Sequence, residues 1–301
     1  MSFAQKVKKE ITLIKNEECC KLAELNAMLK NSTIIKADNN YYLEFQTLNP
    51  SIARRFYSNV KELYNAEMKL TLKKQINLNK KNIYIITILS KTDIIITEHE
   101  LEEDNGNLLL EKDCCKTSFL RGAFLSCGSI NNPYKEYHLE FQTKSTKIAI
   151  LIQQILNYFN LNSKIGKRRN SLIVYIKDAE AISDFLKIIN TTESMLDFED
   201  IRIRRDYNSS LNRLINCRVA NDIKSLDAAT NQLKYIKIIE KKIGLKKLSP
   251  KLVEVIELRK KNPEGSLTDL SNDSFEMGLN LSKSCINHRF RKIKEIVDEL
   301  K

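Results

Sequence analysis

The last helix predicted in the sequence carries side chains suited to reading DNA. Apolar residues recur there at spacings of four, three, four and three, through Ile286, Phe290, Ile293, Val297 and Leu300, which predicts one buried stripe. The other faces of its first half hold no acid before position 295; they carry Lys283, Ser284, Asn287, His288, Arg289, Arg291, Lys292 and Lys294. Side chains of these types bond to base edges and phosphates. We predict a DNA-recognition helix; the alternative is a solvated basic face.

Two shorter helices are predicted before it. An apolar face runs from Leu252 to Leu258, with Leu258 at its edge, and Asn262-Pro263 ends that helix. Ser266 with Asp269 three residues later predicts a capping box for the second helix, and Ser282 can cap the last one. Both serines are included among the predicted DNA contacts. This order of elements predicts a helix-turn-helix domain over residues 247–301.

Further basic residues are candidates for secondary DNA contacts. Two predicted hairpins have basic tips, formed by Lys73, Lys74, Lys80 and Lys81 and by Lys164, Lys167, Arg168 and Arg169. Arg213 and Asn216 lie on a long helix predicted from Ser209 to Ile243. Such residues either grip phosphates, which carries no sequence information, or are solvated turns and interdomain contacts.

Seven cysteines occur in the chain, four of them in two adjacent pairs, Cys19-Cys20 and Cys114-Cys115. Adjacent cysteines point to different sides of a helix, whereas structural zinc prefers two to four intervening residues. The three histidines are scattered. We therefore expect reduced, buried thiols, and neither a metal nor a cofactor.

An internal repeat organises the first two thirds of the chain. Residues 41–47 (YYLEFQT) return 96 residues later as YHLEFQT, and both cysteine pairs precede the repeated segment at nearly the same offset. In residues 41–47, Leu43 and Phe45 alternate with polar residues, which predicts a half-buried strand. Each copy reads as helix, hairpin, helix, hairpin, helix.

The composition favours a soluble protein with a polyanionic partner. Fifty Lys and Arg against 38 Asp and Glu give a net charge of +12, although codon bias in a genome rich in A and T could also enrich lysine. The apolar runs, such as residues 148–155, are too short to cross a bilayer, and no secretion signal is recognisable. We expect a cytoplasmic, nucleoid-associated protein.

Residues 120–129 (LRGAFLSCGS) resemble the signature helix of the LAGLIDADG homing endonucleases. Its glycines suit a helix packed tightly on its twin. In that family the eighth motif position is acidic in each copy, and the pair holds the catalytic metal ions. Here Asn31 and Cys127 stand at those positions, and both are poor ligands for Mg²⁺. The resemblance implies the scaffold without the cleavage chemistry.

The order of segments also resembles the WhiA family of bacterial regulators. The segments that carry this resemblance are residues 1–4 (MSFA), 19–25 (CCKLAEL), 120–125 (LRGAFL), 212–217 (NRLINC) and 282–289 (SKSCINHR). The resemblance implies an α+β fold: a pseudo-two-fold LAGLIDADG-like saddle, followed by an all-α helix-turn-helix domain. We assign the first repeat to residues 1–110, the second to 111–200, a linker helix to 201–246 and the helix-turn-helix to 247–301.

The function expected from this resemblance is regulation through double-stranded DNA. It implies a transcription regulator of cell division and chromosome segregation, or of sporulation in some relatives, with other transcription or division proteins as further partners. No membrane or small-molecule substrate is expected. Two alternatives remain open: an architectural nucleoid protein with little sequence preference, and an active endonuclease or maturase that recruits Glu24 or Asp113.

Overall fold

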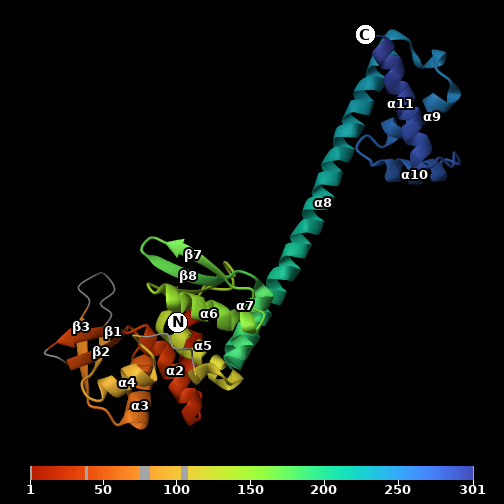
Figure 1. Ribbon diagram of the computed structural model, residues 1–301. Helices are drawn as coiled ribbons and strands as arrows, with labels where there is room; N and C mark the ends of the chain where they lie inside the picture. Colours follow the sequence, from red (N-terminus) through yellow and green to blue (C-terminus); the bar gives the residue numbers. More distant parts are fainter. Residues whose placement is uncertain (1, 38–39, 75–81, 103–107, 301) are drawn as a thin grey trace. The chain divides into compact units, whose positions relative to one another are not determined.

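The computed structural model describes residues 2–37, 40–74, 82–102 and 108–300. The chain divides into two compact units, unit 1 over Met1–Arg205 and unit 2 over Asp206–Lys301. One long helix, α8 (Thr192–Lys242), contributes its first turns to unit 1 and the rest to unit 2 (Figure 1). Within the described residues, no helix is both long and apolar enough to span a membrane.

The first part of unit 1 contains a short helix, α1, followed by the first repeat. Figure 1 shows these helices and strands in red to orange. The elements are α1 (Phe3–Ile11), α2 (Glu18–Lys30), β1 (Thr33–Ala37), β2 (Asn40–Thr47), α3 (Pro50–Tyr64), β3 (Met68–Lys74), β4 (Asn82–Ile88) and α4 (Thr92–Glu98). The strands form an antiparallel sheet in the order β1-β2-β4-β3.

The second repeat has the same order of elements. Its elements are α5 (Asp113–Cys127), β5 (Gly128–Ile130), β6 (Leu139–Thr143), α6 (Thr146–Tyr158), β7 (Lys164–Arg168), β8 (Ser171–Ile176) and α7 (Ala179–Ile188), preceded by the 3-10 turn η1 (Leu108–Leu110). Its antiparallel sheet has the order β5-β6-β8-β7. The predicted α+β fold with two copies of one helix-hairpin-helix-hairpin-helix unit is confirmed.

Local sequence signals start the same helix in both copies. The Asn49 side chain accepts a hydrogen bond from Ser51 N at the start of α3, and Ser145 accepts one from Ile148 N at the start of α6. Both caps satisfy backbone donors that the first turn leaves without partners. At its other end α3 stops at Asn65, whose φ of 47° lies in the left-handed region.

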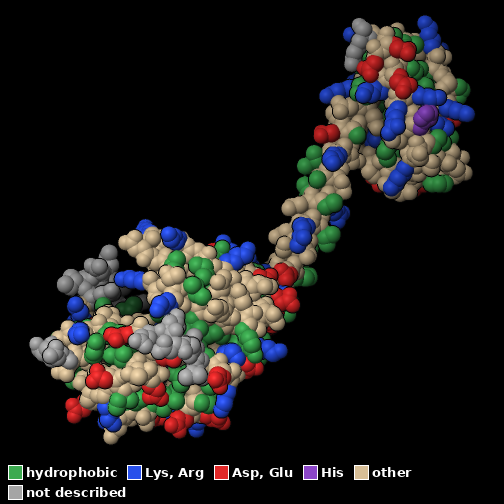
Figure 2. Space-filling model, viewed as in Figure 1, with side chains coloured by type: hydrophobic (Ala, Val, Ile, Leu, Met, Phe, Trp, Pro, Cys, Tyr) green, Lys and Arg blue, Asp and Glu red, His purple; other side chains and the backbone are tan. Residues whose placement is uncertain are grey.

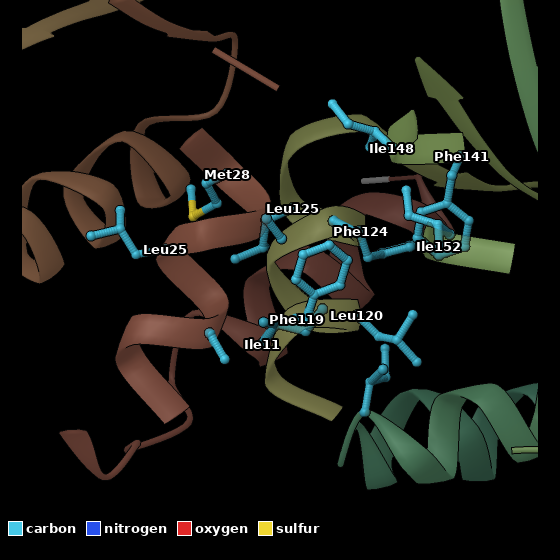
Figure 3. Packing of buried hydrophobic residues seen from close by; sticks show 14 of the residues in the cluster. Ile11, Leu25, Met28, Phe119, Leu120, Phe124, Leu125, Phe141, Ile148 and Ile152 are labelled. Atoms are coloured by element: carbon cyan, nitrogen blue, oxygen red, sulfur yellow. The ribbon is translucent and has the colours of Figure 1, made fainter. Parts of the chain in front are cut away.

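The core of unit 1 lies between the two sheets and the central helix pair α2 and α5. Leu43 and Phe45 of β2 are buried, as the alternation in the sequence predicts, and so is Phe141 of β6. Figure 3 shows side chains of α5, including Phe119 and Phe124, packed in this apolar cluster. The two helices approach closely at Gly122, where an added Cβ would lie 2.1 Å from Glu24 O.

The helix α8 begins earlier than the sequence suggested. It starts at Thr192 rather than near Ser209, because no proline or glycine interrupts the chain between these residues. Its first turns are fixed by packing. The Phe198 ring is buried and lies 6.1 Å from the ring of Phe3 and 5.6 Å from the ring of Tyr137, measured between centroids.

Unit 2 contains the last part of α8 and three further helices. They are α9 (Pro250–Lys261), α10 (Leu267–Glu276) and α11 (Lys283–Glu299), with the 3-10 turn η2 (Leu245–Lys247) before α9. Their core joins Ile236 and Ile239 of α8 to buried residues of all three helices. Leu258, which the sequence placed at the edge of an apolar face, is fully buried.

Candidate nucleic-acid interface

Helix α11 buries one side and exposes the opposite one. Ile286, Phe290, Ile293 and Val297 are buried in the core of unit 2, as predicted, and Ser282 caps the helix by accepting from Cys285 N. The opposite side, here called the outer face of α11, exposes Ser284, His288, Arg291 and Lys292. Figure 2 shows the one histidine of unit 2 among several Lys and Arg side chains.

The remaining predicted contacts of α11 lie beside the outer face. Lys283 and Lys294 are exposed, and Asn287 is half-buried. Before α10, Ser266 forms the predicted capping box with Asp269: Ser266 Oγ accepts from Asp269 N at 3.2 Å, and Ser266 N donates to Asp269 Oδ2 at 2.8 Å. The first three turns of α11 thus expose donors on the outer face and beside it.

Two buried serines set the turn between α10 and α11. Ser271 Oγ donates to Leu281 O at 2.7 Å, and Ser274 Oγ accepts from Leu281 N at 2.9 Å. Positive φ angles at Gly278 and Asn280 reverse the chain between them. Sequence reasoning missed both serines; the signal was two serines three apart on the apolar side of a helix, opposite a turn with glycine.

Arg259 of α9 is a second buried polar residue that sequence reasoning missed. Its side chain is 1% exposed, and Nε donates to Gln232 Oε1 of α8 at 2.9 Å. Its Nη1 donates to the carbonyl oxygens of Asn262 and Gly265, in the segment that leads to α10. Because this buried guanidinium donates hydrogen bonds to carbonyls of the loop after α9 and to a side chain of α8, it holds α8, α9 and α10 together.

Arg289 does not lie on the outer face of α11. Its Nη1 donates to Glu254 Oε2 at 2.6 Å and to Lys251 O at 2.8 Å, both in α9, and its side chain is only 13% exposed. The stripe opposite the core and the flank beside α9 are both polar in the sequence, so spacing alone did not separate them. Arg289 holds α11 on α9 and so positions the residues of the outer face.

The basic hairpins of unit 1 are only partly described. Lys73 and Lys74, and Lys164, Lys167, Arg168 and Arg169 are exposed, whereas Lys80 and Lys81 lie outside the described residues. Arg168 Nη1 donates to both carboxylate oxygens of Glu140 at 3.2 Å. Glu44 occupies the position of Glu140 in the first sheet, so each sheet carries an acid that would oppose DNA on that face.

On α8, Arg213 and Asn216 are exposed. Arg213 Nε donates to Ser209 O at 3.3 Å, one turn earlier on the same helix. Arg213 Nη2 also donates to Ser209 Oγ at 3.3 Å, so both hydrogen bonds stay within one turn of the same helix. Contact of Arg213 and Asn216 with DNA stays a prediction.

At the two positions where the signature helices lack an acid, each side chain donates a hydrogen bond to a carbonyl of its own helix. Asn31 Nδ2 donates to Ala27 O at 2.9 Å, and Cys127 Sγ donates to Ala123 O at 3.3 Å, the same contact four residues back in each copy. Burial raises the pKa of the Cys127 thiol to about 11, so it is uncharged at neutral pH. Neither side chain presents an anionic oxygen.

A lysine stands at the C-terminal end of α5, beside Cys127. Lys8 Nζ of α1 donates to Leu125 O at 3.2 Å and lies 5.5 Å from the centroid of the Phe124 ring. Burial lowers the pKa of Lys8 to about 8, while Cys127 opposes this shift. The primary amine is therefore still mainly protonated at neutral pH and places a positive charge beside Cys127.

The two acids that could have been recruited for cleavage are occupied elsewhere. Glu24 is fully buried and accepts from Arg55 Nε at 2.7 Å, from Asn59 Nδ2 at 3.2 Å and from Asn16 Nδ2 at 2.7 Å. Asp113 is at the opposite end of α5 from Cys127 and accepts from Tyr158 at 2.8 Å.

The paired cysteines meet in space. Cys19, Cys20, Cys114 and Cys115 place their four sulfur atoms within 4.8 Å of one another, at the first turns of α2 and α5. The sequence predicts reduced, buried thiols and no metal, because adjacent cysteines in one segment are poorly spaced for zinc. The cluster is assembled instead by the pairing of two helices.

Three family models match nearly the whole chain. They are the WhiA N-terminal LAGLIDADG-like domain over residues 18–101, the WhiA LAGLIDADG-like domain over 116–208 and the WhiA C-terminal HTH domain over 211–297. A protein of Oceanobacillus iheyensis, named "Probable cell division protein WhiA", is 42% identical over 310 residues, covering 100% of this chain and 98% of the relative. A protein of the same name from Bacillus cytotoxicus is 40% identical with the same coverage.

Solved structures agree with these matches. The crystal structure of full-length DUF199/WhiA from Thermatoga maritima superposes with a TM-score of 0.61 at 26% identity and covers 99% of each chain. The N-terminal LAGLIDADG domain of DUF199/WhiA gives a TM-score of 0.51 at 25% identity, covering 63% of this chain and 90% of that one. These matches confirm the fold expected from the repeats and the helix-turn-helix. The chain belongs to the WhiA family.

Proposed function

We propose that this protein is a cytoplasmic, nucleoid-associated transcription regulator of cell division that reads double-stranded DNA through the outer face of α11. The observation that carries the proposal is the exposed donor surface of α11, which holds no acid before Glu295 and is supported by a capped and packed helix triad. The role in division rests on relatives named probable cell division proteins. A role in chromosome segregation, further transcription or division proteins as partners, and phosphate contacts by the exposed hairpin lysines belong to the same proposal.

Within this surface, we assign base contacts to Ser284, His288 and Arg291, in the first half of the helix, and a phosphate contact to Lys292. Arg289, bonded to Glu254, is a positioning residue in this assignment rather than a base contact. Residues 247–301 contain all three helices of the triad, and Ile236 and Ile239 of α8 complete its core.

Replacing Arg291 by alanine removes a proposed base contact and is expected to weaken binding to a specific site by about 1–3 kcal/mol. Lys292→Ala is expected to reduce the slope of log affinity against log salt concentration by about one, because one phosphate contact is lost. The specific site is first identified by mapping where the protein crosslinks along its host chromosome. Fluorescence anisotropy at several salt concentrations then measures affinity for that fragment and for a scrambled one.

Lys247→Ala is the matched control, because Lys247 is an exposed lysine of η2 outside α10 and α11. Arg289→Ala should lower the melting temperature of unit 2, which separates positioning from contact. Unchanged affinity of Arg291→Ala for the mapped site would exclude this face as the reader. Broad chromosomal occupancy without a motif, lost when the exposed hairpin lysines are replaced, would instead establish the architectural alternative.

We also propose that the LAGLIDADG-like unit does not cut DNA. Asn31 and Cys127 turn back on their helices, and the Lys8 amine lies beside Cys127. Supercoiled plasmid incubated with the protein and Mg²⁺ or Mn²⁺ should stay supercoiled. Metal-dependent nicking that co-elutes with the protein and disappears in Asp113→Asn would contradict the proposal. Nicking that persists in Asp113→Asn but disappears in Glu24→Gln would also contradict it.

A further inference from the structure

The four clustered cysteines are arranged with the symmetry of the repeat. Cys20 Sγ lies 3.6 Å from Cys114 O, and Cys115 Sγ lies 3.8 Å from Cys19 O. Since Cys20 corresponds to Cys115 and Cys19 to Cys114 in the two copies, these are the same contact made in both directions. The approximate two-fold axis that relates α2 to α5 therefore passes through the sulfur cluster.

The spacing of the sulfurs fits a tetrahedral metal site. A Zn–S bond of about 2.3 Å places tetrahedral sulfur ligands about 3.8 Å apart. The sulfurs of Cys114 and Cys115 are 3.9 Å apart, so their adjacency in sequence does not prevent both from binding one ion. The other pairs lie within 4.8 Å and need to close by at most about 1 Å for that geometry.

A buried arginine beside the cluster has an incomplete set of partners. Arg121 of α5 is 4% exposed, and its Nη2 donates to Ser118 Oγ at 2.6 Å. Its Nε has no acceptor in the described part of the chain. Glu24 is the first charge that favours the guanidinium, but Arg55 also binds Glu24 and opposes Arg121; Cys20 and Cys114 act on Arg121 as well. Negative charge on these cysteines would therefore stabilise the buried cation further.

Zinc held by four thiolates would add negative charge beside Arg121. One Zn²⁺ with four thiolates has a net charge of about −2. Arg121 contributes one positive charge, and the N-termini of α2 and α5, where all four cysteines lie, contribute roughly half a charge each. Glu24 and Arg55, which also act on Arg121, form an ion pair without net charge, so these positive charges nearly balance a zinc tetrathiolate.

We propose that Cys19, Cys20, Cys114 and Cys115 bind one structural Zn²⁺ that joins the two repeats at the N-terminal ends of α2 and α5. The soft sulfur set and the tetrahedral spacing favour Zn²⁺ over hard cations such as Mg²⁺. A disulfide across the helices is the competing use of the same four thiols. Cys114 is exposed, which gives the ion a route into an otherwise buried cluster.

The test compares the cluster with cysteines outside it. The full-length protein, purified under reducing conditions, should contain one zinc per chain by elemental mass spectrometry. Cys114→Ser should lose this zinc, whereas the matched variants Cys217→Ser and Cys285→Ser should retain it, because both residues lie outside the cluster. Circular dichroism of each variant checks that the helices are intact.

A second measurement on the unaltered protein does not depend on how a variant folds. Removal of the metal with a chelator should make Cys114 reactive to alkylation, and one equivalent of Zn²⁺ should slow that reaction by at least about tenfold, with Cys217 unaffected. Co²⁺ added to the metal-free protein should give the absorption bands of a tetrahedral thiolate complex.

Three results would overturn the proposal. One is zinc content no higher than in Cys114→Ser, with an alkylation rate of Cys114 that Zn²⁺ does not change. Another is a cross-helix disulfide between Cys20 and Cys114, or between Cys19 and Cys115, in the freshly purified protein. The third is a different metal bound in place of zinc after growth with both available.

Discussion

Replacing Gly122 by alanine is expected to destabilise unit 1 by about 3 kcal/mol or more. The added Cβ would lie 2.1 Å from Glu24 O and 3.0 Å from Ala27 Cβ. The nearest atom is backbone within a helix, so it cannot move aside without separating α2 from α5 along their whole contact. Hydrogen–deuterium exchange of peptides from α2 measures the loss in this unit separately from unit 2.

Gly166→Ala is the matched control for this substitution. Gly166 lies in β7 of the same unit, and its added Cβ would meet Tyr175 Cε1 at 3.4 Å, an ordinary van der Waals contact. We expect its effect to stay within about 1 kcal/mol. Equal exchange rates for the α2 peptides in Gly122→Ala and in the unaltered protein would show that the helices are not packed as described.

The stability of unit 1 is expected to fall as the pH drops below about 6.5, because His99 is held neutral in the fold. His99 is fully buried, and burial, with Lys30 adding to it, lowers its pKa to about 3. Its Nδ1 accepts from Asn26 Nδ2 at 3.3 Å. Tyr64 donates to the Glu98 carboxylate at 2.8 Å, so His99 Nε2–H must donate to the Tyr64 oxygen, 2.9 Å away.

The direction of this pH dependence follows from proton binding at His99. The unfolded chain binds a proton at His99 near pH 6.5, and the folded chain binds it only near pH 3, so acid favours unfolding between these values. The contribution is about 1.4 kcal/mol per pH unit, or roughly 2.5 kcal/mol between pH 7 and pH 4.5. Urea unfolding across this range, followed by exchange in α2 and α4 peptides, measures it.

His99→Leu should remove this part of the pH dependence, whereas His288→Gln should retain it, since His288 is exposed on α11. The difference between variant and unaltered protein isolates His99 from the carboxylates that also titrate in this range. If His99→Leu lost stability with falling pH as steeply as the unaltered protein, the buried neutral histidine would not be the cause.

The sequence determined the elements and their order, because these depend on local patterns. Alternation of apolar and polar residues in residues 41–47 reappears as the buried Leu43 and Phe45 of β2, and the spacing from Ile286 to Val297 reappears as the buried side of α11. Ser266 and Ser282 cap helices as predicted, since a cap needs only its own first turn.

Tertiary structure decided the roles of individual polar residues. Arg289 has the residue type and spacing of a DNA contact, and the fold bonds its Nη1 to Glu254, 35 positions earlier. Arg259, Ser271 and Ser274 bond groups on other elements or across a turn, so no period within one helix marked them. The first turns of α8 likewise depend on Phe3 and Tyr137, which are distant in sequence.

The cysteine cluster likewise depends on tertiary structure and not on a local sequence pattern. Adjacent cysteines within one helix are poorly spaced for zinc, and the sequence therefore argued against a metal. Packing of α2 on α5 through Gly122 brings two such pairs together, and only that contact creates a site with four sulfurs. Local patterns follow from backbone geometry over a few residues, whereas a site between two helices exists only after the chain has paired them.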